Sequence, residues 1–219
     1  IAHLLSISGL HIGIICSMIF LILRLLWRYA PSRWLNIAAP WIAAWGALII
    51  SIVYALLAGF SIATQRSLIM VIMFLSGILL KRNTSSAHNY ILALLIVVLL
   101  EPFAIFNTGF WMSFGAVGLL LYALRGRATK WWQQQWVITI GLFPLTLLFF
   151  SQYSLVAPIA NLIAIPWVSF IVLPLGLLGT LFVLVNANIS CILLGLATKS
   201  FNILLLIINK LAEVPVYNW

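Results

Sequence analysis

Apolar stretches of about 20 residues recur along this chain, and no other feature limits its fold as strongly. Hydrophobic residues make up 65% of the sequence, and charged residues make up only 6%. A soluble domain carries about 25% charged residues, so this chain could not cover a water-exposed surface. The sequence therefore predicts a protein that lies in a membrane.

Helices rather than barrel strands are expected to cross the bilayer. Inside lipid a backbone has to satisfy its own hydrogen bonds, which only helices and closed barrels achieve. The strands of a barrel alternate apolar and polar residues over about 10 positions. Residues 91–100 are apolar on every face, so the predicted fold is all-α.

The expected architecture is a single polytopic helical domain over residues 1–219, with about seven or eight membrane segments. The predicted spanning runs cover approximately residues 4–26, 35–57, 66–81, 90–100 (or onward through 106), 110–124, 136–150 and 189–208. Pro158, Pro166 and Pro174 interrupt residues 155–185, so this stretch is not expected to form one regular helix. Because the chain starts with Ile1 directly in a spanning run, we interpret it as part of a longer protein.

Basic residues gather in every second loop of this series. They are Arg24, Arg28 and Arg33, then Lys81 and Arg82, then Arg125, Arg127 and Lys130. Cytoplasmic loops of membrane proteins collect Lys and Arg, so these loops are predicted to be cytoplasmic and Ile1 to lie outside. The same bias explains most of the net charge of +9. Only two carboxylates are present, Glu101 and Glu213, and a passage for a polyanion would avoid acids because like charges repel strongly at low dielectric.

Polar side chains are unusual in the first predicted span. His3, Ser8 and His11 lie there, and imidazoles in a spanning helix are costly unless they face protein or water. These residues either line a conduit or are hydrogen-bonded groups of a packing helix. Gly9 and Gly13 form a small-xxx-small pair, which lets a second helix approach closely.

Gln65 and Arg66 belong to the most polar stretch outside the basic loops. Arg66 lies at the predicted outer end of its helix, so the cytoplasmic bias of basic residues does not explain it. Its guanidinium can bind phosphate oxygens with two hydrogen bonds, and free backbone N–H groups would favour an anion if Arg66 starts the helix. The alternatives are extension of the side chain to the membrane interface and an ion pair with Glu101, whose loop is on the same side.

Two further segments hold candidate lining residues. Asn107 is expected to cap the helix that contains Phe110 and Ser113. Phe110 can offer a stacking face to an unpaired base, although aromatic packing is the commoner role of such a ring. Asn161 lies in the proline-rich stretch, and broken helices at membrane depth occur only where they are buried in protein or line an aqueous cavity. Asn161 is therefore a candidate lining residue, with a hydrogen bond to a neighbouring helix as the alternative.

Four motifs occur in an order that is typical of one known family. They are "HLLSISGLHIG" at residues 3–13, "SIATQRSLIM" at 61–70, "EPFAIFNTGFWMSFGAVG" at 101–118 and "PIANLIAIPWVSFIVLPLG" at 158–176. With these motifs the chain resembles the membrane domain, or competence domain, of the ComEC family. Each motif is modest alone, but together they are specific and cover most of the chain.

The resemblance implies a channel in the bacterial inner membrane through which one DNA strand enters the cytoplasm during natural transformation. The implied partners are single-stranded DNA, the lipid bilayer, a periplasmic DNA receptor and a cytoplasmic DNA-translocation protein, with self-association into a homo-oligomer as a further option. Full members of the family also carry an OB-like domain and a metallo-β-lactamase-like domain, and the motifs of neither are found in these residues.

Other functions stay as alternatives. A small-solute transporter would show saturable uptake that is independent of DNA, and a non-conducting scaffold of the uptake machinery would tolerate changes of its polar residues. An enzyme is disfavoured because two scattered carboxylates and His residues without an acid partner offer little acid–base machinery. Cys16 and Cys191 lie in apolar runs and no metal-ligand cluster is evident, so neither a metal nor another cofactor is expected.

Overall fold

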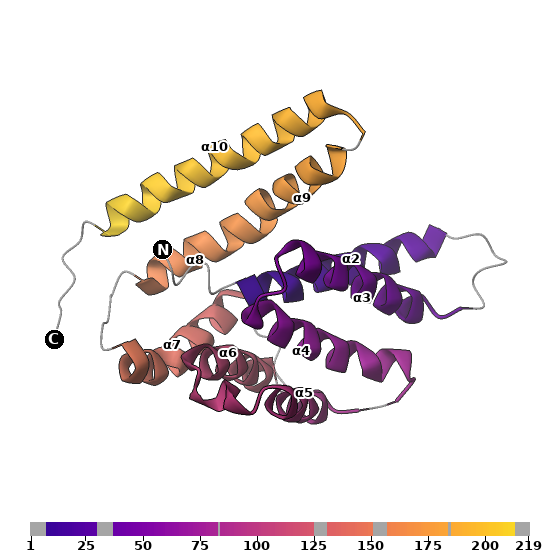
Figure 1. The fold of residues 1–219 in the computed structure, drawn as a ribbon, viewed down its shortest axis with the longest axis vertical. Coiled ribbons are helices and arrows are strands. Elements are labelled where there is room, and N and C mark those ends of the chain that lie inside the picture. Colours follow the sequence, from indigo (N-terminus) through magenta and orange to yellow (C-terminus); the bar gives the residue numbers. More distant parts are fainter. Residues whose placement is uncertain are drawn as a thin grey trace. The chain divides into compact units, whose positions relative to one another are not determined.

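The computed structural model describes residues 8–29, 37–82, 84–124, 131–150, 157–183 and 185–212, and these residues form only helices and connecting turns (Figure 1). The prediction of an all-α fold is confirmed. Five segments are long and apolar enough to cross a membrane, namely His11–Tyr29, Ala39–Leu57, Ile62–Leu79, Ile163–Phe182 and Ala187–Leu211. Shorter apolar helices accompany them, among them Ser86–Leu100, which at 1.5 Å per residue is shorter than a bilayer core of about 30 Å.

Contacts divide the chain into two compact units, residues 1–128 (unit 1) and residues 129–219 (unit 2). Unit 1 contains α2 (Ser8–Leu26), η1 (Trp27–Tyr29), α3 (Ala39–Leu57), α4 (Ile62–Leu79), α5 (Ser86–Leu100), the 3₁₀ segment η3 (Pro102–Phe106) and α6 (Thr108–Leu124). Unit 2 contains α7 (Trp131–Phe150), α8 (Ala157–Trp167), the π-helical segment η4 (Val168–Val172), α9 (Leu173–Phe182) and α10 (Ala187–Ala212). The expectation of a single domain stays a prediction, and each unit is described by itself.

Helix α4 is the central element of unit 1, where it packs against α2, α3 and α5 (Figure 1). Leu68, Val71 and Leu75 join a core cluster with residues of α2 and α3. Met70 joins a second cluster, which contains residues of α5, η3 and α6. A helix that is surrounded in this way has little room for a charged side chain. Arg66 lies on this helix, so its side chain is buried among the packed helices.

The packing of α3 is typical of a helix in lipid. Its buried residues are all small: Ala43, Ala44, Ala47, Ser51 and Ala55. Large apolar side chains on the same helix are exposed, among them Trp45, Ile49 and Leu56. In lipid no hydrophobic force drives helices together, so small residues line the interfaces while large apolar residues can face the acyl chains. Unit 1 therefore has the side-chain distribution of a membrane domain.

Gly46 of α3 marks a close contact with α2. The side chain of Leu23 occupies the space in which a Cβ atom at Gly46 would lie. We expect Gly46→Leu to lower the free energy of unfolding of the purified protein by about 1–3 kcal/mol, because overpacking forces the two helices apart. Thermal unfolding in detergent measures this change, with Ile49→Leu on the exposed face of α3 as the control. Equal unfolding temperatures for the two variants would contradict the close packing of Leu23 against Gly46.

The proline-rich stretch is not one regular α-helix, as predicted, but its backbone is helical over the described residues 157–182. The interruption is the π-helical segment η4, in which the N–H of Leu173 donates to the carbonyl of Val168. An ordinary α turn would bring the ring of Pro174 against the carbonyl of Phe170, and a π turn changes this spacing by one residue. Pro166 lies inside α8 without ending it. The prolines therefore change the type of helix in this stretch and do not interrupt the helical backbone at residues 166–174.

Candidate functional site

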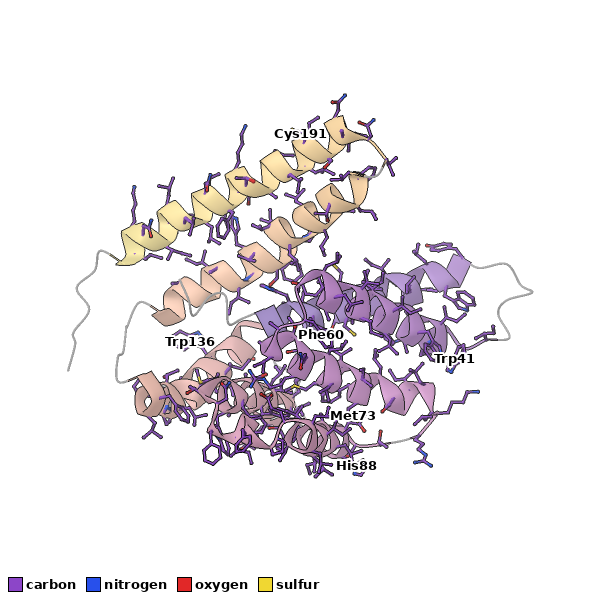
Figure 2. All side chains as sticks on the ribbon, viewed as in Figure 1. Trp41, Phe60, Met73, His88, Trp136 and Cys191 are labelled. Carbon is purple, nitrogen blue, oxygen red and sulfur yellow. The ribbon has the colours of Figure 1, made fainter. Side chains whose placement is uncertain are left out.

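A tight turn joins α3 to α4 and sets the start of α4. Gly59 has a φ of 76° and Phe60, labelled in Figure 2, has a φ of 49°. The N–H of Gly59 donates to the carbonyl of Leu56 and the N–H of Phe60 to that of Ala55, which is the Schellman pattern of a helix end. Only glycine adopts such a positive φ without a steric cost, so Gly59 allows the chain to reverse here.

Ser61 caps the N-terminus of α4, so the helix begins at Ile62. The start predicted from the sequence was near Arg66, one turn further along the chain. The hydroxyl of Ser61 accepts a hydrogen bond from the N–H of Thr64 at 3.4 Å, because a serine before the first turn satisfies a free backbone donor. The side-chain amide of Gln65 donates to the carbonyl of Phe60 at 2.9 Å and so supports the turn. Arg66 therefore lies beyond the free N–H groups of the helix, and the predicted help from these groups in anion binding does not apply to it.

Arg66 is buried, with only 5% of its surface exposed. Its Nε and Nη1 atoms are shielded from solvent and have no hydrogen-bond partner among the residues that the structure describes. Other buried polar residues of α4 differ, since Thr64 donates to the carbonyl of Ser61 at 2.7 Å and Ser67 to that of Ala63 at 3.1 Å. An unpaired charge in an apolar interior is costly. Arg66 is thus a buried charged residue of unit 1 whose hydrogen-bonding groups are only partly used by the described residues.

Neither alternative for Arg66 describes what the structure shows. A side chain that extends to the membrane interface would be exposed, and this one is buried. The carboxylate of Glu101 interacts electrostatically with Arg66, but the two form no direct ion pair among the described residues. The guanidinium therefore keeps hydrogen-bonding capacity that its protein neighbours do not use.

The start of α6 lies directly beside this guanidinium. The Oδ1 atom of Asn107 accepts a hydrogen bond from the N–H of Gly109 at 2.8 Å, so the predicted cap is confirmed. A Cβ atom at Gly109 would lie 3.0 Å from Nη2 of Arg66 and 3.2 Å from Oδ1 of Asn107. The absence of a side chain at Gly109 gives the guanidinium its space. We call Arg66, Asn107 and Gly109 the Arg66 site.

The aromatic residues of α6 pack with one another and with α5. Phe110 is 3% exposed, and its ring lies 4.8 Å from that of Phe114 and 5.6 Å from that of Trp111. The hydroxyl of Tyr90 on α5 donates to the carbonyl of Phe114 at 2.8 Å. In this arrangement the ring of Phe110 is part of the core, which favours its packing role over base stacking. Ser113 lies half-buried on the same helix.

The candidate residues of the first span are not gathered at the Arg66 site by the described structure. His3 lies outside the described residues, and Ser8 and Gly9 are described only as part of the backbone of α2. His11 is half-buried. A Cβ atom at Gly13 would meet no atom within 4 Å, whereas a close approach between α2 and α3 is described at Gly46. The lining and packing roles of these residues stay predictions.

Unit 2 contains the last candidate, Asn161, which lies in α8 with a side chain outside the described residues. The hydroxyl of Ser169 in η4 is buried and has no hydrogen-bond partner among the described residues, which was not predicted. Also not predicted is the hydrogen bond that joins α8 to α10, in which Nε1 of Trp167 donates to the hydroxyl of Ser200 at 2.9 Å. No sequence pattern indicates either feature, because both depend on which helices become neighbours.

The Arg66 site is suited to binding an anion. Its positive charge lies in apolar surroundings, where electrostatic attraction is stronger than in water. A guanidinium presents N–H donors in a planar fork that matches the oxygens of a phosphate or a carboxylate. The side chains at this site include no nucleophile that is paired with a base. The site can hold and orient a negative group.

Comparison with known proteins finds relatives of this chain in several bacteria. Competence protein ComA of Neisseria gonorrhoeae is 34% identical over 185 residues, which cover 82% of this chain and 26% of that protein. Recombination protein 2 of Haemophilus influenzae is 29% identical over 204 residues, covering 83% of this chain and 26% of that protein. ComE operon protein 3 of Bacillus subtilis is 28% identical over 229 residues, covering 99% of this chain and 27% of that protein.

The chain spans about a quarter of the length of these relatives. No solved structure matches it. The family described as "Competence protein" matches residues 1–219, the whole of the chain. Because this match covers the whole chain, the chain belongs to the Competence protein family.

Proposed function

We propose that this chain is the membrane part of a protein that passes single-stranded DNA through the bacterial inner membrane into the cytoplasm during natural transformation. The family and the names of the relatives support a role in competence. The apolar helices support a location in a membrane, with several crossings. The chain spans only about a quarter of the length of these relatives, so the activity of the whole protein is part of the proposal.

The observation that supports DNA as the substrate most directly is the buried guanidinium of Arg66. Burying an arginine without a full set of hydrogen bonds destabilises the fold. A role of Arg66 in binding a ligand would explain why such a residue is present despite this cost. A DNA strand presents a phosphate at every nucleotide, and arginine binds phosphate in a planar, two-bonded geometry. Arg66 is then the residue that contacts the strand backbone as it passes unit 1.

The charge distribution agrees with this substrate. The sequence contains 11 Lys and Arg residues but only two acids, so few negative groups repel a polyanion. Neutralising phosphates with cations is the main source of affinity that does not depend on base sequence. Such contacts suit a channel that must accept any sequence.

The proposal includes no chemical step in these residues. Unit 1 and unit 2 guide the strand, while a periplasmic receptor delivers it and a cytoplasmic translocation protein receives it. Association of several copies is compatible with this role. Degradation of the complementary strand belongs to other residues or other proteins.

The test uses a naturally transformable host that lacks its own copy of the parent protein. Labelled double-stranded DNA is added, and the label is followed first into the periplasm and then into the cytoplasm, with and without a plasmid that encodes the full-length protein. We expect label to accumulate in the periplasm without the protein and to enter the cytoplasm when the protein is restored.

Equal entry of label into the cytoplasm in both strains would refute a DNA channel. Saturable uptake of a small solute that needs the protein but no DNA would then support a transporter. If cytoplasmic entry needs the protein but tolerates changes of every polar candidate residue, a scaffold is the better description. Each outcome therefore selects one function.

A further inference from the structure

A second polar site lies at the opposite end of α4, where the chain turns into α5. An open cavity of about 480 Å³ is lined there by Phe74, Gly77, Ile78, Lys81, Arg82, Thr84, Ser86 and Asn89. His88, labelled in Figure 2, lies on the first turn of α5 and marks this end of unit 1. None of the lining residues is acidic. We call this place the α4–α5 cavity.

The backbone that carries the two cations of the cavity has a defined, hydrogen-bonded conformation. The N–H of Arg82 donates to the carbonyl of Gly77 at 3.0 Å, and the N–H of Lys81 donates to that of Ile78 at 3.2 Å, which form a Schellman helix end. Lys81 occupies the position of this motif that glycine usually takes, with a φ of 52°. A side chain in this left-handed conformation is sterically unfavourable. The fold thus keeps a lysine at a strained position beside the cavity.

The floor of the cavity holds polar groups that protein atoms leave unpaired. The hydroxyl of Thr84 is buried and has no hydrogen-bond partner among the described residues. Asn89 is 6% exposed, and no hydrogen bond of its side-chain amide is found in the described part of the chain. Both side chains lie over Gly77, where a Cβ atom would come within 2.7 Å of the Thr84 hydroxyl and 3.4 Å of Nδ2 of Asn89. Gly77 therefore makes room for these polar groups.

The first turn of α5 adds backbone donors at the same place. Ser85 caps the helix by accepting a hydrogen bond from the N–H of His88 at 3.2 Å. The preceding N–H groups of the turn lie next to Ser86, which lines the cavity. The N-terminus of a helix favours negative charge. Two cations, an amide, a hydroxyl and a helix N-terminus thus converge on one cavity without an opposing acid.

The lining also has an apolar side, which distinguishes this cavity from a site for a small soluble anion. Phe74 and Ile78 lie one turn apart on α4, on the way from the cations into the segment that can span the membrane. A ligand that fits both sides has a phosphate at one end and a hydrocarbon part at the other. An anionic phospholipid has this structure, and basic pockets between membrane helices bind such head groups.

We propose that the α4–α5 cavity binds the head group of an anionic phospholipid, with the phosphate at Lys81, Arg82 and Asn89 and the glycerol end beside Phe74 and Ile78. This site anchors the loop between α4 and α5 at the membrane surface. It lies at the other end of α4 from Arg66, and it does not depend on whether the protein conducts DNA.

The test measures lipid binding by the purified full-length protein in detergent. Bound phosphatidylglycerol and phosphatidylcholine are counted by native mass spectrometry after equal additions of each. We expect the wild type to retain phosphatidylglycerol preferentially, and Lys81→Gln/Arg82→Gln to reduce this preference by about 25-fold, since each cation at a membrane surface contributes about fivefold. Asn89→Leu leaves the net charge unchanged, and we expect it to reduce the preference by about threefold to tenfold.

The control is Arg24→Gln/Arg28→Gln, which removes two exposed cations of another basic loop. It should leave the preference within about twofold of the wild type. An equal loss in the two double variants would show diffuse surface attraction and overturn the proposal, as would an unchanged preference in Asn89→Leu. Unfolding temperatures in the absence of lipid identify any variant that fails to fold, and the folded one of Lys81→Gln/Arg82→Gln and Asn89→Leu then decides the test.

Two competitors identify the source of the phosphate. Neither glycerol phosphate nor an oligonucleotide of single-stranded DNA should displace bound phosphatidylglycerol at equal concentration, because neither fills the apolar side of the cavity. Displacement by glycerol phosphate would identify a soluble phosphate site, and displacement by the oligonucleotide would identify a DNA site. Either result would overturn the lipid assignment.

Discussion

Replacing Arg66 by methionine should reduce entry of DNA into the cytoplasm by about tenfold to a hundredfold, while DNA still reaches the periplasm. The reason is that a hydrogen bond to a charged group contributes about 1.5–3 kcal/mol, and each 1.4 kcal/mol corresponds to a factor of ten. Arg66→Lys keeps the charge but loses the planar fork, so its entry rate should fall between those of the wild type and Arg66→Met. Labelled DNA in the transformable host measures all three proteins.

The same substitution should not destabilise the protein. Nε and Nη1 of Arg66 have no hydrogen-bond partner among the described residues, so an apolar side chain of similar length removes a cost rather than a contact. We expect the unfolding temperature of Arg66→Met in detergent to equal or exceed that of the wild type. Arg24→Met, which removes an exposed cation at the end of α2, should change neither entry nor unfolding temperature. A destabilised Arg66→Met protein with normal DNA entry would show that Arg66 is structural.

Gly109→Ala should reduce DNA entry by about tenfold, although it places only one methyl group in unit 1. The new Cβ atom would lie 3.0 Å from Nη2 of Arg66, so the flexible end of the arginine has to move. Such a movement loses about one charged hydrogen bond to a phosphate. The fold itself should tolerate the change, because alanine favours a helix over glycine by about 1 kcal/mol. DNA entry and thermal unfolding of the same protein test both parts.

Gly118→Ala is the matched control, since it makes the same change in the same helix. Its new Cβ atom would lie 3.1 Å from the hydroxyl of Tyr90 rather than near Arg66, so DNA entry should stay within about twofold of the wild type. In the double variant Arg66→Met/Gly109→Ala, the glycine substitution should add nothing to the loss caused by Arg66→Met. Additive losses would mean that Gly109 acts by another route than the position of the guanidinium.

The sequence was sufficient for the features that depend on composition and local pattern. The scarcity of charge and the recurring apolar runs predicted an all-α membrane domain, and the described residues contain helices at each predicted run. The cap at Asn107 was also predictable, because an Asn before an apolar helix accepts a hydrogen bond from the first turn. The four ordered motifs indicated the family, which the match over residues 1–219 confirms.

Helix boundaries were less accurate where a capping residue decides them. The start of α4 was expected near Arg66, but Ser61 places it at Ile62 and moves Arg66 into the helix. This difference matters for function, because it removes the free N–H groups from the arginine and puts the side chain among packed helices. The π-helical segment before Pro174 was not predicted either, and with it the described residues 157–182 are helical.

What the sequence alone determined is therefore the class of fold, the polar segments on either side of unit 1 and the family. The tertiary structure decided which of these segments meet. Arg66 and Gly109 are far apart in the chain, and neither residue type predicts that a glycine on α6 leaves space for an arginine on α4. The same holds for Lys81 and Asn89, which face one cavity only because a Schellman end turns the chain between α4 and α5. Periodicity and composition indicate which faces of each helix are polar and which are apolar. Which faces meet depends on the packing of all the helices in the unit.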